Sequence, residues 1–256
     1  MIDLKCFYML QCLHKSMNKE ENAMFEQFMF GGYVDGTQVT NQSIPYVVEK
    51  ENGQERTYDL ASRMMKDRLI FLDTDFNDQM AHVIKMQLLW LDSQSDEPIT
   101  LYICSPGGSV VSGLGIADVV HSLRSPVRTV VMGYAASMGC YTQSTMGTPG
   151  YRLGGQRSYV MCHQVSSGTK GVIMDQKISL AHSERLNTLL MTEIANAVGV
   201  SYEQLLEDAN RDLWLNAEEA LNYGTKGFYD AIILDGKPNN KGQYRVKRRN
   251  GVEDWV

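Results

Sequence analysis

The chain has few cysteines, few histidines and no surplus of positive charge, and each shortage excludes a class of function. Its five cysteines follow no regular spacing, and neither a Cys-x-x-Cys pair nor a Cys/His cluster with metal-ligand spacing occurs. A disulfide framework is therefore not expected, and the free thiols favour a reducing compartment such as the cytoplasm. For the same reason we predict no metal site, and we expect no cofactor.

Charge and hydropathy exclude two further classes. The net charge is -6 at pH 7, whereas a dedicated nucleic-acid binder needs a basic face for its phosphate contacts. A membrane helix needs about 20 consecutive apolar residues, and no run in this sequence approaches that length. The hydrophobic fraction of 43 % is ordinary for a globular protein with a buried core. The sequence thus predicts neither a nucleic-acid nor a membrane partner.

Three zones follow one another along the 256 residues. Residues 1–43 form an expected N-terminal extension, because Gly31-Gly32 and a polar stretch interrupt any regular pattern. Residues 44–235 alternate strand-like and helix-like segments and form the predicted globular domain. Residues 236–256 are rich in Lys, Arg, Asn and Gly, and we predict a solvated polar tail of low order.

The middle zone has the pattern of an α/β layered fold. Its helical segments carry apolar residues at intervals of three and four, as at Met80, Val83, Ile84, Leu88 and Leu91. Strands separated by such helices predict repeated crossover connections. The expected strands are 68–72, 99–104, 127–132 and 158–161, and the expected helices are 78–91, 112–123, 137–146, 175–197 and 201–207.

Two glycine-containing turns come directly after predicted strands. The first, Ser105–Gly108, allows a sharp bend that presents backbone N–H groups to a ligand. The second, Gly133–Gly139, places Ser137 among small residues at the start of a helix, close to backbone donors. Each also has an ordinary interpretation, a plain strand-to-helix turn for the first and a helix cap for Ser137. The G-x-S-x-G elbow of many hydrolases is absent.

A serine becomes a nucleophile only beside a base, because its hydroxyl is protonated at neutral pH. His163 ends a predicted strand and opens a Ser/Gly loop, which is a common place for a catalytic group. The other histidines lie in the extension or in predicted helices among polar neighbours: His14, His82, His121 and His182. A third group must be a carboxylate that orients the imidazole. Asp208 and Asp212 both follow the helix 201–207, and the pattern alone does not choose between them.

Several blocks of sequence resemble the signatures of ClpP peptidases, in the same order along the chain. They are Ser105–Gly108, Met132–Gly139, Val160–Gln164, Asn210–Asp212, Ala217–Ala220 and Tyr223-Gly224. The resemblance runs from about Ile44 to Leu234 without large gaps. It implies the ClpP/crotonase-like α/β fold, with repeated β-β-α units and a protruding handle helix. It also implies a serine endopeptidase subunit of an ATP-dependent protease that cuts unfolded polypeptides into short peptides.

Carried over residue by residue, the resemblance assigns the catalytic roles. Ser137 matches the nucleophile, His163 the general base and later acid, and Asp212 rather than Asp208 the orienting carboxylate of an acyl-enzyme mechanism.

The resemblance places backbone donors beside this triad. The N–H groups of Gly108 and Met138 match the donors of the oxyanion hole. The segment 166–172, with Gly168 and Gly171, is expected to pair with the substrate backbone, because glycine suits the close approach of two backbones. A flexible connector is the alternative for that segment.

Assembly and partners also follow from the resemblance. The family forms two stacked heptameric rings, so we expect a homo-oligomer in which the apolar face of helix 175–197 packs against a neighbouring subunit. A hexameric AAA+ unfoldase of the Clp type is the expected partner, and Tyr102 matches a position that lines its docking cleft. The extension 1–43 is a candidate propeptide, removed within residues 30–44, unless it is an ordered addition that stays attached.

Three departures from the family pattern qualify these expectations. Val165 stands where a proline is usual, so a looser loop after His163 is expected. Asn210 replaces an acidic residue that helps to join two rings, and Cys104 replaces a common asparagine. Two other functions stay open: a non-catalytic ring subunit, and a crotonase-type acyl-CoA enzyme, which uses glycine-turn N–H groups without a Ser/His/Asp set.

Overall fold

The computed structural model describes residues 45–51, 53–235, 239 and 243–256. The expected extension 1–43, and with it the expected leader, lies outside the described residues. The fold below is that of the unit from Tyr46 to Val256. None of the described helices combines the length and the apolar character that a membrane crossing requires.

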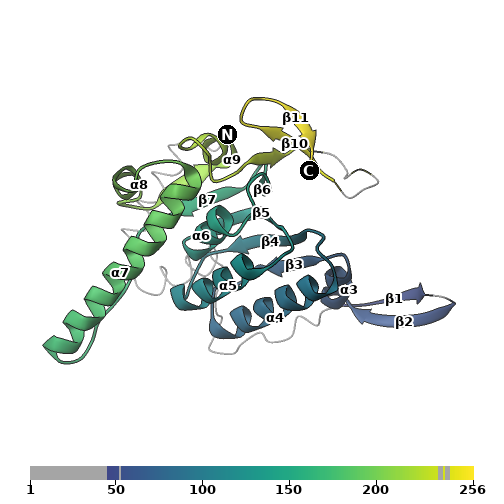
Figure 1. The fold of residues 1–256 in the computed structure, drawn as a ribbon, viewed down its shortest axis with the longest axis horizontal. Helices are drawn as coiled ribbons and strands as arrows, with labels where there is room; N and C mark the ends of the chain where they lie inside the picture. The colour runs from purple at the N-terminus through teal and green to yellow at the C-terminus, as the bar shows by residue number, and fades with distance from the viewer. Residues whose placement is uncertain (1–44, 52, 236–238, 240–242) are drawn as a thin grey trace, which may run out of the picture. The chain divides into compact units, whose positions relative to one another are not determined.

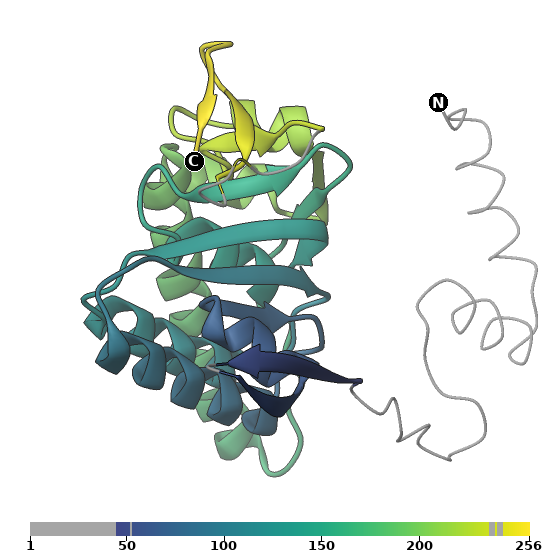
Figure 2. The same cartoon turned by 90° about the vertical axis from the view of Figure 1, so that its right-hand side faces the viewer.

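A nine-stranded sheet forms the centre of this unit, in the order β11-β10-β9-β6-β5-β4-β3, with β7 pairing with β5 and β8 (Figure 2). The pairs β3–β4, β4–β5, β5–β6, β6–β9 and β5–β7 are parallel. The strands are β3 Leu69–Leu72, β4 Ile99–Ser105, β5 Val127–Ala136, β6 Arg152–Gly155, β7 Tyr159–Cys162, β8 Leu213–Asn216, β9 Ala231–Ile233, β10 Arg245–Arg248 and β11 Glu253–Trp255. Helices join the neighbouring parallel strands, as the predicted crossover connections require.

Seven helices surround this sheet in the described part of the chain (Figure 1). They are α3 Leu60–Lys66, α4 Asp78–Gln94, α5 Val110–Ser122, α6 Met138–Thr145, α7 Ile173–Val198, α8 Tyr202–Asp208 and α9 Ala217–Asn222. In α4, Ile84, Leu88 and Leu91 are buried, as the helical spacing predicts, whereas Val83 is exposed. Ahead of the sheet, β1 (Tyr46–Glu51) and β2 (Gln54–Asp59) form an antiparallel hairpin that projects from the body next to α3 (Figure 1).

Only the C-terminal part of α7 packs on the body of the protein. Its buried residues all lie in the last third of the helix: Leu190, Met191, Ile194, Ala195 and Val198. Its first half extends beyond the sheet (Figure 1) and exposes Ile173, Met174, Ile178 and Leu180. The predicted protruding helix is therefore present.

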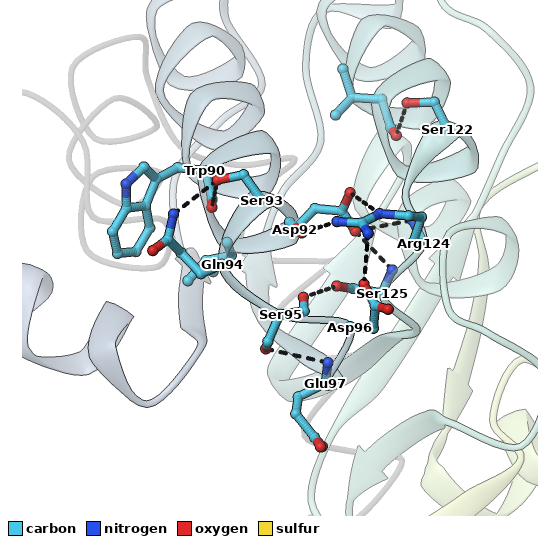
Figure 3. A network of polar contacts seen from close by, with 12 residues as sticks. Trp90, Asp92, Ser93, Gln94, Ser95, Asp96, Glu97, Ser122, Arg124 and Ser125 are labelled. Atoms are coloured by element: carbon cyan, nitrogen blue, oxygen red, sulfur yellow. Dashed lines mark hydrogen bonds and ion pairs between the residues drawn. The ribbon is translucent and has the colours of Figure 1, made fainter.

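Polar contacts fix the end of the sheet at which β4 and β5 begin (Figure 3). The Asp92 carboxylate, near the end of α4, accepts hydrogen bonds from the N–H groups of Arg124 at 3.0 Å and Ser125 at 2.8 Å. The Arg124 guanidinium donates back to the Asp92 carbonyl at 2.7 Å. The N–H group of Ser125 is the main cause that lowers the pKa of Asp92. This corner holds α4 against the residues that lead into β5, at the opposite end of the strands from the glycine turns.

Strand β5 is longer than the sequence predicts. It was expected to end at Met132, before a glycine turn, but it continues to Ala136. Gly133 adopts a left-handed φ of 99°, and the pairing with β4 shifts from Ile103↔Val131 to Ser105↔Ala135. Two extra residues on β5 therefore form a bulge, and the strand resumes beyond it. The expectation of a turn from Gly133 was wrong, because a bulge absorbs the glycine without ending the pairing.

The expectation of a solvated tail of low order is wrong for residues 243–256. Strand β10 pairs with β9, and β11 pairs with β10, so this segment extends the sheet. Val246 and Val256 are buried in a second apolar cluster together with Val130 and Leu153. The many charges that suggested solvation are paired instead, as in Arg248–Asp254 and Lys247–Glu218.

Candidate active site

Ser137 is the single residue between β5 and α6, and its backbone is strained. Its φ of 54° and ψ of -115° are unusual for a residue with a side chain, and such a conformation costs about 1–3 kcal/mol. Its N–H group donates to the Met161 carbonyl at 2.9 Å, which fixes it to β7. The side chain does not cap α6. The helix-cap interpretation of this serine is therefore wrong, and its hydroxyl is free for another role.

The turn after β4 lies directly against Ser137. A Cβ atom on Gly107 would come within 2.6 Å of the Ser137 Cβ and 2.8 Å of the Ala136 carbonyl oxygen. A Cβ atom on Gly108 would meet the Phe76 backbone at 2.5 Å. Both glycines have φ in the left-handed region, at 95° and 142°. Only glycine fits these two positions, and the fit brings the backbone of the turn next to the serine.

His163 reaches the serine hydroxyl directly. Its Nε2 lies 2.8 Å from Ser137 Oγ. The parallel pairing of β5 with β7 sets Ala136 opposite Met161, so the residues that follow the two strands come out side by side. The His163 side chain is half-buried, at 27 % exposure. The four-residue strand β7 thus positions this imidazole against the start of α6.

The antiparallel pairing of β7 with β8 decides which aspartate faces the imidazole. Cys162 lies opposite Leu213, so the next residue of β7 and the preceding residue of β8, His163 and Asp212, lie opposite each other. Asp212 Oδ1 is 3.3 Å from His163 Nδ1. Asp208 faces elsewhere, because its carboxylate accepts from the Tyr223 hydroxyl at 2.6 Å and from Gln204 at 2.8 Å. The structure therefore brings Asp212, and not Asp208, to the imidazole.

A pocket of about 190 Å³ opens beside these three side chains. Its lining combines backbone from the glycine turn with apolar side chains of α6 and α7: Gly108, Val110, Ser137, Met138, Tyr141, His163, Gln164, Val165, Ser166, Leu190, Met191 and Ile194. Among the described residues, no hydrogen bond occupies the N–H groups of Gly108 and Met138. Both residues line the same pocket as Ser137, and backbone donors without a partner are the kind of group that can stabilise a developing oxyanion.

The expected substrate glycines are farther from this chemistry. The segment 166–172 forms no strand, and neither Gly168 nor Gly171 is among the residues that line the pocket. A Cβ atom on Gly168 would meet nothing within 4 Å, so open space surrounds it. Gly171 has a left-handed φ of 111° just before α7 begins. Pairing with the substrate backbone stays a prediction for both.

The other histidines among the described residues do not join this site. His82, His121 and His182 are exposed on helices, as the sequence predicts. In the part of the chain that the structure describes, no group of three or more His, Cys, Asp or Glu side chains is arranged to hold a metal ion.

Comparison with known proteins places the chain in a family. The family model described as Clp protease matches residues 52–234. The chain belongs to the Clp protease family. It is 40 % identical over 202 residues to "ATP-dependent Clp protease proteolytic subunit 1" of Salinibacter ruber, covering 78 % of this chain and 85 % of the relative. It is also 42 % identical over 193 residues to the "ATP-dependent Clp protease proteolytic subunit" of Streptococcus agalactiae serotypes V and III, covering 74 % of this chain and 96 % of each relative.

Family membership confirms the predicted ClpP/crotonase-like α/β fold and the predicted class of activity, a serine-type peptidase subunit. The match to the Clp protease family ends at Leu234, so strands β10 and β11 lie beyond it.

Two residues at the site were not singled out from the sequence. Gly107 was seen only as part of a turn, although it, more than Gly108, touches the serine. Asn187, on α7, accepts a hydrogen bond from the N–H group of Val165 at 2.8 Å. A signal for Asn187 did exist, because it precedes Leu190, Met191 and Ile194 at helical spacing and is the polar member of that face.

Proposed function

We propose that this chain hydrolyses peptide bonds of unfolded polypeptides with Ser137 as nucleophile, His163 as general base and acid, and Asp212 as orienting carboxylate. The observation that carries the proposal is the continuous chain of contacts from Ser137 Oγ to His163 Nε2 at 2.8 Å and from His163 Nδ1 to Asp212 at 3.3 Å. Each contact joins the two atoms that an acyl-transfer triad requires.

The proposed reaction passes one proton through His163 in each of its two halves. Ser137 Oγ attacks the carbonyl carbon while its proton passes to His163 Nε2, and the tetrahedral oxyanion accepts from the N–H groups of Gly108 and Met138. His163 then gives the proton to the leaving amine, which departs and leaves an acyl-enzyme. A water that gives its proton to His163 then attacks the acyl carbon, and His163 returns that proton to Ser137 Oγ as the second product leaves. Losing one oxyanion donor typically costs about 2.7–4 kcal/mol of transition-state stabilisation.

Asp212 supports this cycle from the outer side of the imidazole. A carboxylate at Nδ1 keeps the proton on that nitrogen, so Nε2 is free to accept from the serine. The Asp212 side chain is 60 % exposed, and the 3.3 Å contact is looser than a short hydrogen bond. Catalytic contacts of this kind often tighten only when substrate is bound.

Two other functions fit the site less well. A non-catalytic ring subunit has no need of a strained serine aligned with a histidine and a carboxylate. A crotonase-type enzyme would use the glycine-turn N–H groups but not the three side chains. The alignment at Ser137 therefore favours the peptidase over both.

We further propose that the chain acts within two stacked heptameric rings and receives substrate from a hexameric Clp unfoldase in a reducing, cytoplasm-like compartment. Exposed apolar residues on the free half of α7, such as Ile173 and Ile178, suit contact with another subunit. At the proposed unfoldase cleft, the Tyr102 ring stacks on Phe71 at 5.2 Å, and its hydroxyl lies 2.8 Å from that of Tyr244. Negative-stain images of seven-fold rings are expected, and monomers alone would contradict this assembly.

Hydrolysis of a short fluorogenic peptide tests the catalytic proposal. Wild-type protein is expected to cleave the peptide, and Ser137→Ala is expected to assemble equally well and to lose the activity. Cleavage by Ser137→Ala near the wild-type rate would refute the assignment of the nucleophile.

We propose that residues 1–43 form a leader ahead of the peptidase domain, and that the assembled enzyme trims it within residues 30–44. A polar segment is suited to entering a peptidase site in an extended form. The same pair of proteins tests this by intact mass. A shortened wild type beside a full-length Ser137→Ala protein supports trimming, and two full-length masses contradict it.

A further inference from the structure

The segment that follows His163 has no strand to hold it. Strand β7 ends at Cys162, and no regular element occurs again before α7 begins at Ile173. Nevertheless Gln164, Val165 and Ser166 line the pocket beside Ser137. The imidazole and one wall of the pocket therefore depend on whatever fixes this irregular stretch of backbone.

Asn187 makes the contact that fixes it. Its side-chain Oδ1 accepts from the Val165 N–H group at 2.8 Å, and its Nδ2 lies 3.4 Å from the Gln164 Oε1. All three residues are half-buried. A backbone N–H group that is removed from water needs a partner, because leaving it without one is costly. A single amide thus holds two consecutive residues after the imidazole.

The position of Asn187 on α7 ties this contact to the opposite wall of the pocket. Asn187 precedes Leu190, Met191 and Ile194 by three, four and seven residues, so all four share one helix face. The three apolar residues line the pocket. The Asn187 amide therefore joins the wall that carries His163 to the wall formed by α7.

We propose that Asn187 is a positioning residue that acts through the Val165 backbone and holds His163 in line with Ser137. The inference rests on the proposed function, since it concerns the same triad. Proline, which has no N–H group, cannot make this contact. With valine at position 165, the backbone N–H group is present, and the Asn187 side chain on α7 holds it by a hydrogen bond. The loop after the imidazole is therefore not left loose by the absence of proline.

The rate at which a fluorophosphonate labels Ser137, measured on assembled full-length protein, tests this role. Asn187→Ala is expected to lower the labelling rate about three- to ten-fold, the range of one lost hydrogen bond. Asn187→Asp is expected to recover most of the rate, because a carboxylate oxygen accepts from the same N–H group. Asn196→Ala, at an exposed asparagine of the same helix, should label at the wild-type rate.

A double-mutant cycle separates positioning from a general loss of stability. Val165→Pro removes the donor, so adding Asn187→Ala to it should change the labelling rate little. An equal loss in both backgrounds would overturn the proposal, as would an Asn187→Ala protein that labels within two-fold of wild type. If Val165→Pro does not assemble, the comparison of Asn187→Ala with Asn187→Asp decides, and equal loss in both again overturns it. Wild-type protein that is not labelled at Ser137 would refute the proposed function instead.

Discussion

Replacing Gly107 by alanine should disable the site without unfolding the protein. The new Cβ would lie 2.6 Å from the Ser137 Cβ, whereas ordinary contact begins at 3.4 Å, so the two must separate by about 0.8 Å. The new side chain would also sit at a φ of 95°, which costs about 1–3 kcal/mol of folding free energy. A displacement of about 1 Å can lower a catalytic rate about 100-fold. We therefore expect Gly107→Ala to label with fluorophosphonate about 100-fold more slowly than wild type.

Gly150→Ala is the matched control for backbone strain. Gly150 has nearly the same φ, 93°, but its Cβ would meet nothing within 4 Å. Both variants carry the cost of a left-handed residue, Gly107→Ala carries the steric overlap in addition, and only Gly107→Ala should lose labelling. The two rates are measured on assembled protein with the same probe. A Gly107→Ala protein that labels within about three-fold of Gly150→Ala would refute the reasoning from close approach.

Three further predictions follow from other contacts. Asp212→Asn should lower peptide turnover about 10⁴-fold, because the imidazole loses the partner that fixes its tautomer, and Asp208→Asn should change turnover little. The reverse ranking in one kinetic assay would contradict the register of β7 and β8. Asp230→Asn breaks the ion pair between Asp230 and Arg152, whose atoms are 2.6 Å apart and whose side chains are 13 % and 7 % exposed, so the free energy of unfolding should fall by about 3–5 kcal/mol. A melting temperature equal to that of Asp235→Asn, at an exposed site, would contradict this prediction. Tyr244→Phe, which keeps the ring but removes the contact with Tyr102, should alter stimulation by an unfoldase more than basal peptide cleavage, and equal effects on both would speak against a role in docking.

The alternation of segments predicted the parallel core because each crossover repeats the same local pattern. Periodicity failed at Gly133, since a glycine before small residues looks the same whether the chain turns or forms a bulge. Pairing with β4 on one side and β7 on the other decides that the strand continues. This pairing joins residues that are distant in sequence, so it cannot be predicted from the neighbouring residues alone.

The site could be predicted in its parts but not in its geometry. Ser137 stands at the start of a predicted helix and His163 at the end of a predicted strand, and that much is local. The choice of Asp212 over Asp208 depends on the register of β7 with β8, and on the Tyr223 hydroxyl that engages the other carboxylate. The C-terminal segment escaped prediction for a similar reason. Its charged residues suggest exposure to solvent when only the sequence is read, because their ion-pair partners, such as Glu218 for Lys247, are distant in sequence.

The most direct test of the central claim is to map the fluorophosphonate adduct by peptide mass spectrometry on wild-type and His163→Ala protein. The account predicts one adduct on Ser137 in the wild type and almost none in His163→Ala, because the serine loses the base that lies 2.8 Å from its hydroxyl. An adduct on another serine, or equal labelling of Ser137 in the two proteins, would contradict it.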